Sequence, residues 1–200
     1  MRLFVALEVP EPVRREVRRR LAGLRERLPR ARWVDPDVLH VTLLFLGEVD
    51  GGQAEGLAGA LRRSAAAFAP LPLRLARGGT FPPGRPARVA WVGVEGPPEI
   101  AALQAAVTAA AQEALGPAAQ PAESRAFRPH VTVARCPSPW PRGAAEKFAG
   151  AFPGEVGPPF LVAHGVLLES RMSPRGGGAP RYRALAELPL AGPLLPGAAA

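Results

Sequence analysis

A short motif occurs twice in this chain of 200 residues, and the two copies constrain the fold more than any other feature. His40-Val41-Thr42-Leu43 and His130-Val131-Thr132-Val133 share the pattern histidine, apolar, threonine, apolar, and contain two of the three histidines. Because side chains alternate along a strand, each copy places an imidazole and a hydroxyl on one face and two apolar groups on the other. Two such strands brought together would surround one small anion.

The flanking segments predict an α+β fold. Apolar alternation and turn residues indicate strands, whereas apolar spacings of three and four indicate helices. We expect strands at residues 3–9, 39–49, 71–76, 88–95, 128–135, 160–170 and 182–188. We expect helices at residues 11–28, 53–68, 98–115 and 143–152.

The order of these segments predicts two lobes within one domain. Each half of the chain contains a helix and a motif strand, followed by another helix and a strand pair. This order lacks a regular βαβ rhythm, so we expect mainly antiparallel sheets, a pseudo-twofold axis, and motif strands that face each other across it. The single two-lobed domain is expected to span residues 1–188, and residues 189–200 to form a flexible tail.

Composition restricts the class of protein. The chain is 48% hydrophobic, yet no apolar run reaches the roughly 18 residues that a membrane-spanning helix needs. The N-terminus is charged too early for a secretory signal, so a cytoplasmic location is expected. The single cysteine, Cys136, excludes an internal disulfide and a cysteine-based zinc site, and its position indicates an inert residue at a strand end.

The charge balance permits two interpretations. The formal net charge is +8, and every basic residue except Lys147 is arginine, which binds phosphate bidentately and stacks on bases. A polyanionic partner such as RNA fits this balance. A general bias toward arginine, alanine, proline and glycine fits it equally well, with a solvated helix face carrying Arg14, Arg15, Arg18, Arg19 and Arg20.

Paired histidines suit acid–base chemistry on a phosphodiester. One imidazole takes a proton from the nucleophile and the other gives a proton to the leaving oxygen, because imidazole titrates near neutral pH. The hydroxyls of Thr42 and Thr132 can donate hydrogen bonds to the non-bridging oxygens as charge develops there. No metal ion is needed for this chemistry.

Other interpretations of these residues are weaker. His164 has no threonine two residues later and is expected to be structural. Neither motif histidine has a cysteine or carboxylate at a recognisable zinc-ligand spacing, so no metal site is expected. Gly176-Gly177-Gly178 lacks the lysine of a phosphate-binding loop, and we expect it to connect a hairpin.

The motifs and their flanks resemble those of a known family. Residues 40–49 (HVTLLFLGEV) and 127–135 (FRPHVTVAR) are similar to the paired motifs of the 2H phosphoesterases. Within that superfamily they look most like the bacterial and archaeal RNA 2′,3′-cyclic phosphodiesterases, also called 2′-5′ RNA ligases. Residues 2–7 (RLFVAL) and 33–34 (WV) are similar as well, so the resemblance covers residues 1–188.

The resemblance implies a two-lobed fold with the site in a central cleft. It implies hydrolysis of a 2′,3′-cyclic phosphate at an RNA end to a 2′-phosphate, without metal or cofactor. His40 would be the general acid that protonates the 3′ oxygen, His130 the general base that activates water, and Thr42 and Thr132 the phosphate ligands. The two motifs are nearly interchangeable, so the sequence alone does not assign acid and base. Reversed, the same chemistry would join RNA ends by a 2′-5′ linkage.

Three further side chains are candidates for the site. Arg135 matches an arginine that often follows the second motif of the family, and it would neutralise phosphate charge. Strict alternation places Arg135 opposite His130, although the strand is expected to end at Pro137. Phe45 also falls opposite its histidine and is expected in the core, whereas Trp33 could either stack on a base or pack inside.

Two alternatives to this function remain open. The first is another reaction of the superfamily, on a linear 2′-5′ oligonucleotide or a small cyclic nucleotide. The second is an RNA-binding module whose histidines hold a terminal phosphate without turnover, which the basic balance also fits. The expected partner is an RNA or oligonucleotide end, without membrane or metal, and the expected state is a monomer because no apolar stripe requires a partner.

Overall fold

The structure, a computed structural model, describes residues 1–116, 126–171 and 180–193. The strands are β1 (Arg2–Glu8), β2 (Arg32–Trp33), β3 (His40–Glu48), β4 (Leu71–Phe81), β5 (Ala87–Glu95), β6 (His130–Trp140), β7 (Glu155–Val162), β8 (His164–Arg171) and β9 (Arg181–Pro189). The α-helices are α1 (Glu11–Ala22), α2 (Ala54–Ala65), α3 (Glu99–Leu115) and α4 (Arg142–Gly150). Short 3₁₀ turns are η1 (Arg25–Arg27), η2 (Pro36–Val38) and η3 (Gly51–Gln53).

The strands form two antiparallel half-sheets that meet at one point. The strand order is β7-β4-β5-β6-β3-β1-β8-β9, and β2 pairs with β6 beyond the end of β3. Between β3 and β6 the only residue pair in register within the described chain is Val41 with Val131. We call the half containing β3, β1, β8 and β9 the β3 lobe, and the half containing β6, β5, β4 and β7 the β6 lobe. The expected α+β, antiparallel, two-lobed fold is confirmed.

The lobes are interleaved along the chain and do not correspond to its two halves. The β3 lobe takes strands from both ends of the chain, because β1 lies between β3 and β8. The β6 lobe takes β4, β5, β6 and β7 from the middle of the chain, and β2 from between β1 and β3. Apolar alternation reports which face of a strand is buried but carries no information on which strand lies beside it.

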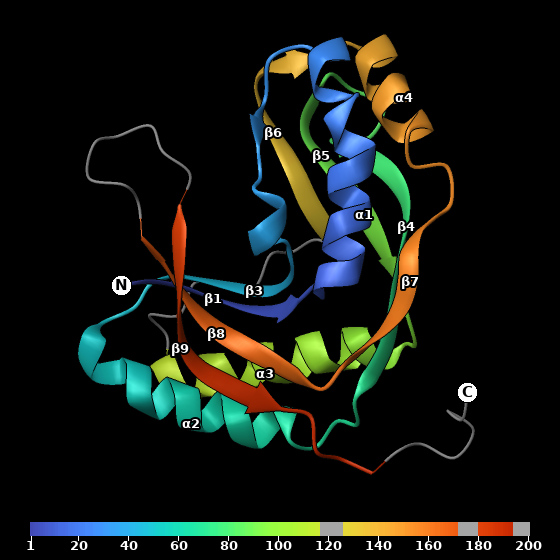
Figure 1. The fold of residues 1–200 in the computed structure, drawn as a ribbon. Coiled ribbons are helices and arrows are strands. Elements are labelled where there is room, and N and C mark those ends of the chain that lie inside the picture. The colour runs from blue at the N-terminus through green and yellow to red at the C-terminus, as the bar shows by residue number, and fades with distance from the viewer. Residues whose placement is uncertain (117–125, 172–179, 194–200) are drawn as a thin grey trace.

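Helices cover the outer faces of both half-sheets. In Figure 1, α2 and α3 lie together under the β3 lobe, and α1 and α4 lie against the β6 lobe. The apolar faces of the helices and of both half-sheets join into one buried core, which includes Val13, Leu57, Leu103 and Phe148. Among the described residues, no helix has the length and apolar character that crossing a membrane requires.

Several element boundaries differ from those expected. The strand β6 continues through Pro137 to Trp140, because its second edge is unpaired beyond β2 and a proline without an N–H is tolerated there. Residues 160–170 belong to two strands, β7 and β8, rather than one. The helix expected over residues 11–28 ends at Ala22, and η1 completes the segment.

The C-terminal segment remains packed beyond β9. Leu190, inside the expected tail, is buried and donates its N–H to the carbonyl of Ala163. The N–H of Gly192 is bonded to the carbonyl of Phe68, so the packed chain extends past residue 188. Residues 194–200 and the triple glycine at 176–178 lie outside the described residues.

Candidate active site

The two motifs begin the central strands at equivalent positions. The first seven residues of β3 and β6 have the same sequence of buried, half-buried and exposed side chains. Val41 and Val131, the second residues of the two motifs, pair with each other, so the motifs run in opposite directions past this point. The sequence motifs are therefore brought together about the junction of the lobes, as expected.

A β-bulge in β6 brings Arg135 onto the same face as His130. In β6, the residues opposite Gly93, Trp91 and Val89 of β5 are His130, Thr132 and Arg135. These three β5 residues alternate by two, so their partners share one face of the sheet. Val133 is the extra residue of this bulge. The alternation of side chains between the two faces of β6 is therefore interrupted at Val133 and not at the end of the strand.

An equivalent bulge occurs in β3. Here the residues opposite Glu8, Ala6 and Phe4 of β1 are His40, Thr42 and Phe45, and the bulge adds Leu43. The expectation that Phe45 packs in the core is wrong, because its side chain is 57% exposed. We call the common surface of both half-sheets the histidine face; it carries His40, Thr42, Phe45, His130, Thr132 and Arg135.

Both imidazoles are oriented by the backbone. Nδ1 of His40 lies 2.8 Å from the carbonyl oxygen of Val38, and Nδ1 of His130 lies 2.7 Å from that of Arg128. Since a carbonyl oxygen can only accept, Nδ1 of each ring donates the hydrogen bond. The Nε2 atom of each imidazole is therefore the ring nitrogen left to exchange a proton.

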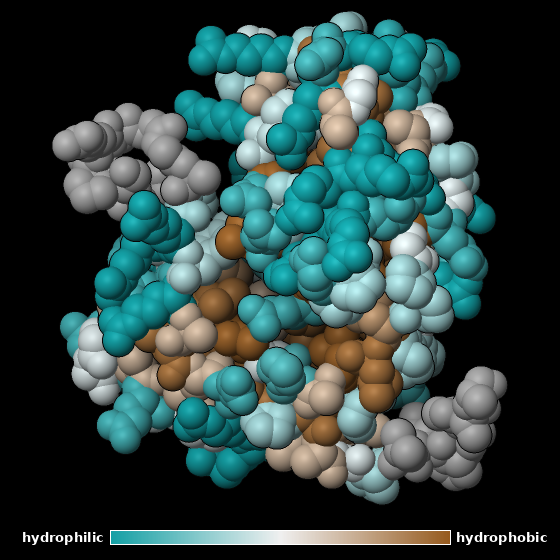
Figure 2. All heavy atoms as spheres, in the orientation of Figure 1, coloured by the Kyte–Doolittle hydropathy of each residue, from teal (hydrophilic) through white to brown (hydrophobic). Residues whose placement is uncertain are grey.

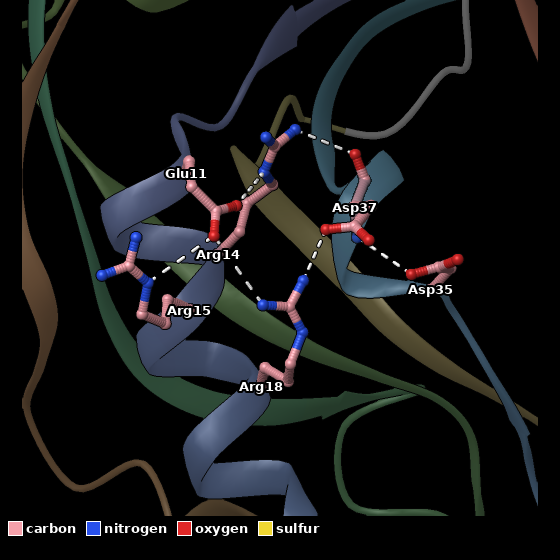
Figure 3. Close-up of polar contacts among 6 residues, drawn as sticks. All are labelled: Glu11, Arg14, Arg15, Arg18, Asp35 and Asp37. Carbon is pink, nitrogen blue, oxygen red and sulfur yellow. Dashed lines mark hydrogen bonds and ion pairs between the residues drawn. The ribbon is translucent and has the colours of Figure 1, made fainter.

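The turn that orients His40 is tied to helix α1 (Figure 3). The guanidinium of Arg14 donates to the carbonyl of Asp37 at 2.9 Å, and Arg18 pairs with the Asp37 carboxylate. Asp35 caps the same turn by accepting from the N–H of Asp37. These contacts fix η2 immediately before β3, so the arginine-rich face of α1 is partly neutralised and supports the site indirectly.

Aromatic rings pack around each imidazole. Phe4 and Tyr182 lie 5.1 Å and 5.3 Å from the ring of His40. Phe81 and Trp91 lie 5.1 Å and 6.1 Å from the ring of His130. Sequence reasoning missed these four residues, because strand register, which decides their position, is not readable from alternation alone. Figure 2 shows hydrophobic side chains gathered in the lower half of the view, below the hydrophilic surface of α1.

Burial and neighbouring charges act on the protonation of His40. Burial lowers the pKa of His40, and the positive charges of Arg135 and the His130 ring lower it further. The bond to the Val38 carbonyl and the carboxylate of Glu8 oppose this shift. The position of Arg135 on the face of His130 accounts for its influence on His40.

Two positions break the symmetry of the histidine face. Glu8 lies opposite His40, whereas the equivalent position opposite His130 is Gly93. The exposed residue after each bulge is Phe45 in β3 and Arg135 in β6. One imidazole therefore has a carboxylate as its cross-strand neighbour and the other does not.

The other residues that the sequence singles out lie either on the core side or outside the two motif strands. Trp33 pairs with Ala134, a core-facing residue, and its ring packs 5.9 Å from that of Trp140. His164 begins β8, two strands from β3, and lies opposite Pro189 of β9. Cys136 is buried, and burial raises the pKa of its thiol, which suits an inert residue.

Neither a group of metal ligands nor the surface groove between α2 and α3 offers an alternative site among the described residues. In the part of the chain that the structure describes, no group of three His, Cys, Asp or Glu residues could hold a metal ion. A surface groove of about 710 Å³ lies between α2 and α3, but it carries none of the motif residues.

The chain matches the family model of the 2′-5′ RNA ligase superfamily over residues 9–170. It belongs to this superfamily. The family membership expected from the sequence motifs is thus confirmed. The RNA 2′,3′-cyclic phosphodiesterase of Thermus thermophilus is 32% identical over 196 residues, covering 96% of this chain and 91% of the relative. The enzyme of the same name from Methanothermobacter thermautotrophicus is 29% identical over 177 residues, covering 88% and 93%.

Solved structures share the fold of this superfamily member. The crystal structure of TT0787 from Thermus thermophilus has a TM-score of 0.79 and 31% identity, covering 96% of this chain and 99% of that one. Escherichia coli LigT complexed with 3′-AMP has a TM-score of 0.72 and 25% identity, covering 94% and 97%. The two-lobed arrangement is therefore that of experimentally known members.

Proposed function

We propose that this protein hydrolyses 2′,3′-cyclic phosphate ends of RNA to 2′-phosphates, by two-histidine acid–base catalysis without a metal ion. The observation that carries the proposal is the histidine face. It presents two imidazoles, each bound through Nδ1 to a carbonyl, together with both threonines and Arg135. The names of the relatives and the superfamily support the same activity.

The reaction requires that one proton be removed from water and that one proton be donated to the leaving oxygen. Nε2 of His130 takes a proton from water as the water oxygen attacks phosphorus. The bond from phosphorus to the 3′ oxygen breaks, and Nε2 of His40 gives this oxygen its proton. The products are a 2′-phosphate and a free 3′ hydroxyl. Thr42, Thr132 and Arg135 stabilise the non-bridging oxygens as negative charge develops on them.

The asymmetry of the face supports His40 as the general acid. The carboxylate of Glu8 favours the protonated imidazole of His40, and His130 faces Gly93 instead. Burial and the positive charge of Arg135 lower the pKa of His40 in the free protein, so the bound phosphate must supply further stabilisation of the protonated ring. An opposite charge next to an imidazole has this effect.

The same groups could also catalyse ligation. A 2′-5′ linkage forms if a 5′ hydroxyl attacks the cyclic phosphate in place of water, gives its proton to the base, and the bond from phosphorus to the 3′ oxygen breaks. Water is far more concentrated, so hydrolysis is the expected net outcome. The monomeric state and the cytoplasmic location stay predictions.

Hydrolysis of a short RNA ending in a 2′,3′-cyclic phosphate, with EDTA present, tests the proposal. Phosphorus NMR locates the product phosphate. A 2′-phosphate formed by the wild type but not by His130→Ala supports the proposed reaction. A 3′-phosphate would overturn the assignment of the leaving oxygen. Tight, salt-sensitive binding without turnover would favour the alternative of an RNA-end-binding module.

A further inference from the structure

A second arginine stands beside Arg135 on the histidine face. Arg32, in the two-residue strand β2, is directly opposite Arg135 in the antiparallel pairing with β6. Directly opposed residues project from the same side of a sheet. Because the bulge of β6 places Arg135 on the histidine face, Arg32 extends that face along the edge of β6 that β3 no longer covers.

This arginine pair has no neutralising partner in the described parts of the chain. Nine other arginines form ion pairs with carboxylates, among them Arg14, Arg18 and Arg74, but Arg32 and Arg135 form none there. Like charges directly opposite each other destabilise a strand pair. Both side chains are exposed, so an anionic ligand could reach both guanidinium groups.

We propose that Arg32 forms a second phosphate subsite, which binds the backbone phosphate on the 5′ side of the terminal nucleotide. This inference rests on the proposed function, in which Arg135 contacts the cyclic phosphate. The cyclic phosphate closes the 3′ end of an RNA, so every other phosphate of the strand lies on its 5′ side. Neighbouring strands are about 5 Å apart, so two arginines in register can each hold one of two successive phosphates.

The subsite defines the substrate as a chain rather than a mononucleotide. A nucleoside 2′,3′-cyclic phosphate has only the phosphate at the histidines, and it leaves Arg32 without a ligand. An oligonucleotide occupies both positions. Arg32 reads no base, so it selects for chain length without selecting for sequence.

A neutral linkage at one position tests the subsite. Two RNAs ending in a 2′,3′-cyclic phosphate are compared, one natural and one with a methylphosphonate in the first linkage on the 5′ side. For the wild type, kcat/KM for the natural RNA should exceed that for the neutral-linkage RNA by about tenfold, as for the loss of one charge-assisted hydrogen bond. For Arg32→Gln, the two values should be about equal.

A matched control separates this contact from a general loss of charge. Arg63, exposed on α2, lies in the groove with α3, and Arg63→Gln should retain the tenfold ratio. The dependence of log KM on log salt for the natural RNA should also weaken by about 0.7 in Arg32→Gln only. A tenfold ratio that persists in Arg32→Gln, or no effect of the neutral linkage on the wild type, would overturn the subsite.

A binding measurement keeps the subsite separate from the catalytic proposal. The same pair of linkages is placed in RNAs ending in a 2′-phosphate, and their affinities are measured by calorimetry. If no RNA is hydrolysed but the affinity ratio depends on Arg32, the subsite stands and the proposed reaction fails. If hydrolysis occurs and neither ratio depends on Arg32, the reaction stands and the subsite fails.

Discussion

At the residue scale, the proposed chemistry depends on two imidazoles that differ mainly in their surroundings. Both donate Nδ1–H to a backbone carbonyl two residues earlier, and both lie between aromatic rings. The charge of their surroundings differs, because His40 lies opposite the carboxylate of Glu8 and His130 lies opposite Gly93. The different roles that we propose for them therefore follow from neighbouring residues and not from the motif itself.

Removing either imidazole should nearly abolish turnover. His40→Ala and His130→Ala each remove one proton-transfer group, so kcat should fall by about 10²- to 10⁴-fold. Steady-state hydrolysis of the cyclic-phosphate RNA measures the loss, and circular dichroism checks the fold. His164→Ala, which removes the histidine that lies outside both motifs, should retain wild-type activity. Full activity in either motif variant would exclude the two-histidine mechanism.

The pH dependence of kcat/KM should change when the carboxylate of Glu8 is removed. If His40 must be protonated, kcat/KM falls as the pH rises through the pKa of His40 in the free enzyme. Glu8 raises this pKa, so Glu8→Gln should move the alkaline limb of the profile to lower pH. Arg135 lowers it, so Arg135→Gln should move the limb to higher pH while weakening phosphate binding. Glu113→Gln, on an exposed position of α3, is the control. An alkaline limb that does not move in Glu8→Gln would contradict the assignment of His40 as the acid.

The residues of the site were predictable only in part. The motif made His40, Thr42, His130 and Thr132 visible, because a period of two needs no knowledge of neighbouring strands. The sequence gives no sign of the bulge at Val133, and without it Arg135 would point into the core. The cross-strand neighbours Glu8 and Arg32 depend on register, which alternation leaves open.

At the element scale, helix α1 links the two lobes through its charged face. Arg14 and Arg18 hold the turn before β3, and Arg20 donates to the carbonyl of Glu155 at the start of β7. The apolar face of the same helix is buried in the core. The arginines of α1, which the sequence predicts to cover a solvated helix face, thus also make specific contacts with η2 and β7.

Glu16 should contribute to stability only above strongly acidic pH. Hydrogen bonds from Arg19 and Arg20 lower the pKa of Glu16 from 4.5 to about 2. A carboxyl with a lowered pKa in the folded state stabilises the protein above its unfolded pKa, and this contribution is lost as the pH falls from 4.5 to about 2. Because such pairs are screened by solvent, Glu16→Gln should reduce the free energy of unfolding by at most about 1 kcal/mol at neutral pH.

Chemical denaturation at several pH values measures this effect. The difference between wild type and Glu16→Gln should shrink steadily below pH 4.5. Glu146→Gln is the matched control, because Glu146 pairs with Arg142 on the exposed surface of α4. A difference for Glu16→Gln that stays constant down to pH 2 would show that its effect is not electrostatic.

At the scale of the whole molecule, the interleaved lobes share one hydrophobic core. Composition and segment order were sufficient to predict an α+β fold with two lobes, because they depend on local periodicity. The path of the chain was not predictable, because pairing β1 with β8 depends on contacts between the two ends of the chain. Neither lobe is a continuous segment, so neither can be expected to fold alone.

Unfolding should therefore be a single transition that involves both lobes. All three tryptophans, Trp33, Trp91 and Trp140, lie on strands of the β6 lobe, so their fluorescence reports that lobe. Far-ultraviolet circular dichroism reports the helices and strands of both lobes. If the core is shared, the two signals should change at the same denaturant concentration.

A core substitution in the β3 lobe gives the stronger test. Leu7 in β1 is fully buried, and Leu7→Ala should lower the free energy of unfolding by about 2 to 5 kcal/mol. Because no tryptophan lies in the β3 lobe, a tryptophan transition that shifts with this substitution would show that the lobes unfold together. A circular dichroism transition that shifts alone, with the fluorescence midpoint unchanged, would mean that the single pair Val41–Val131 joins two lobes that unfold independently.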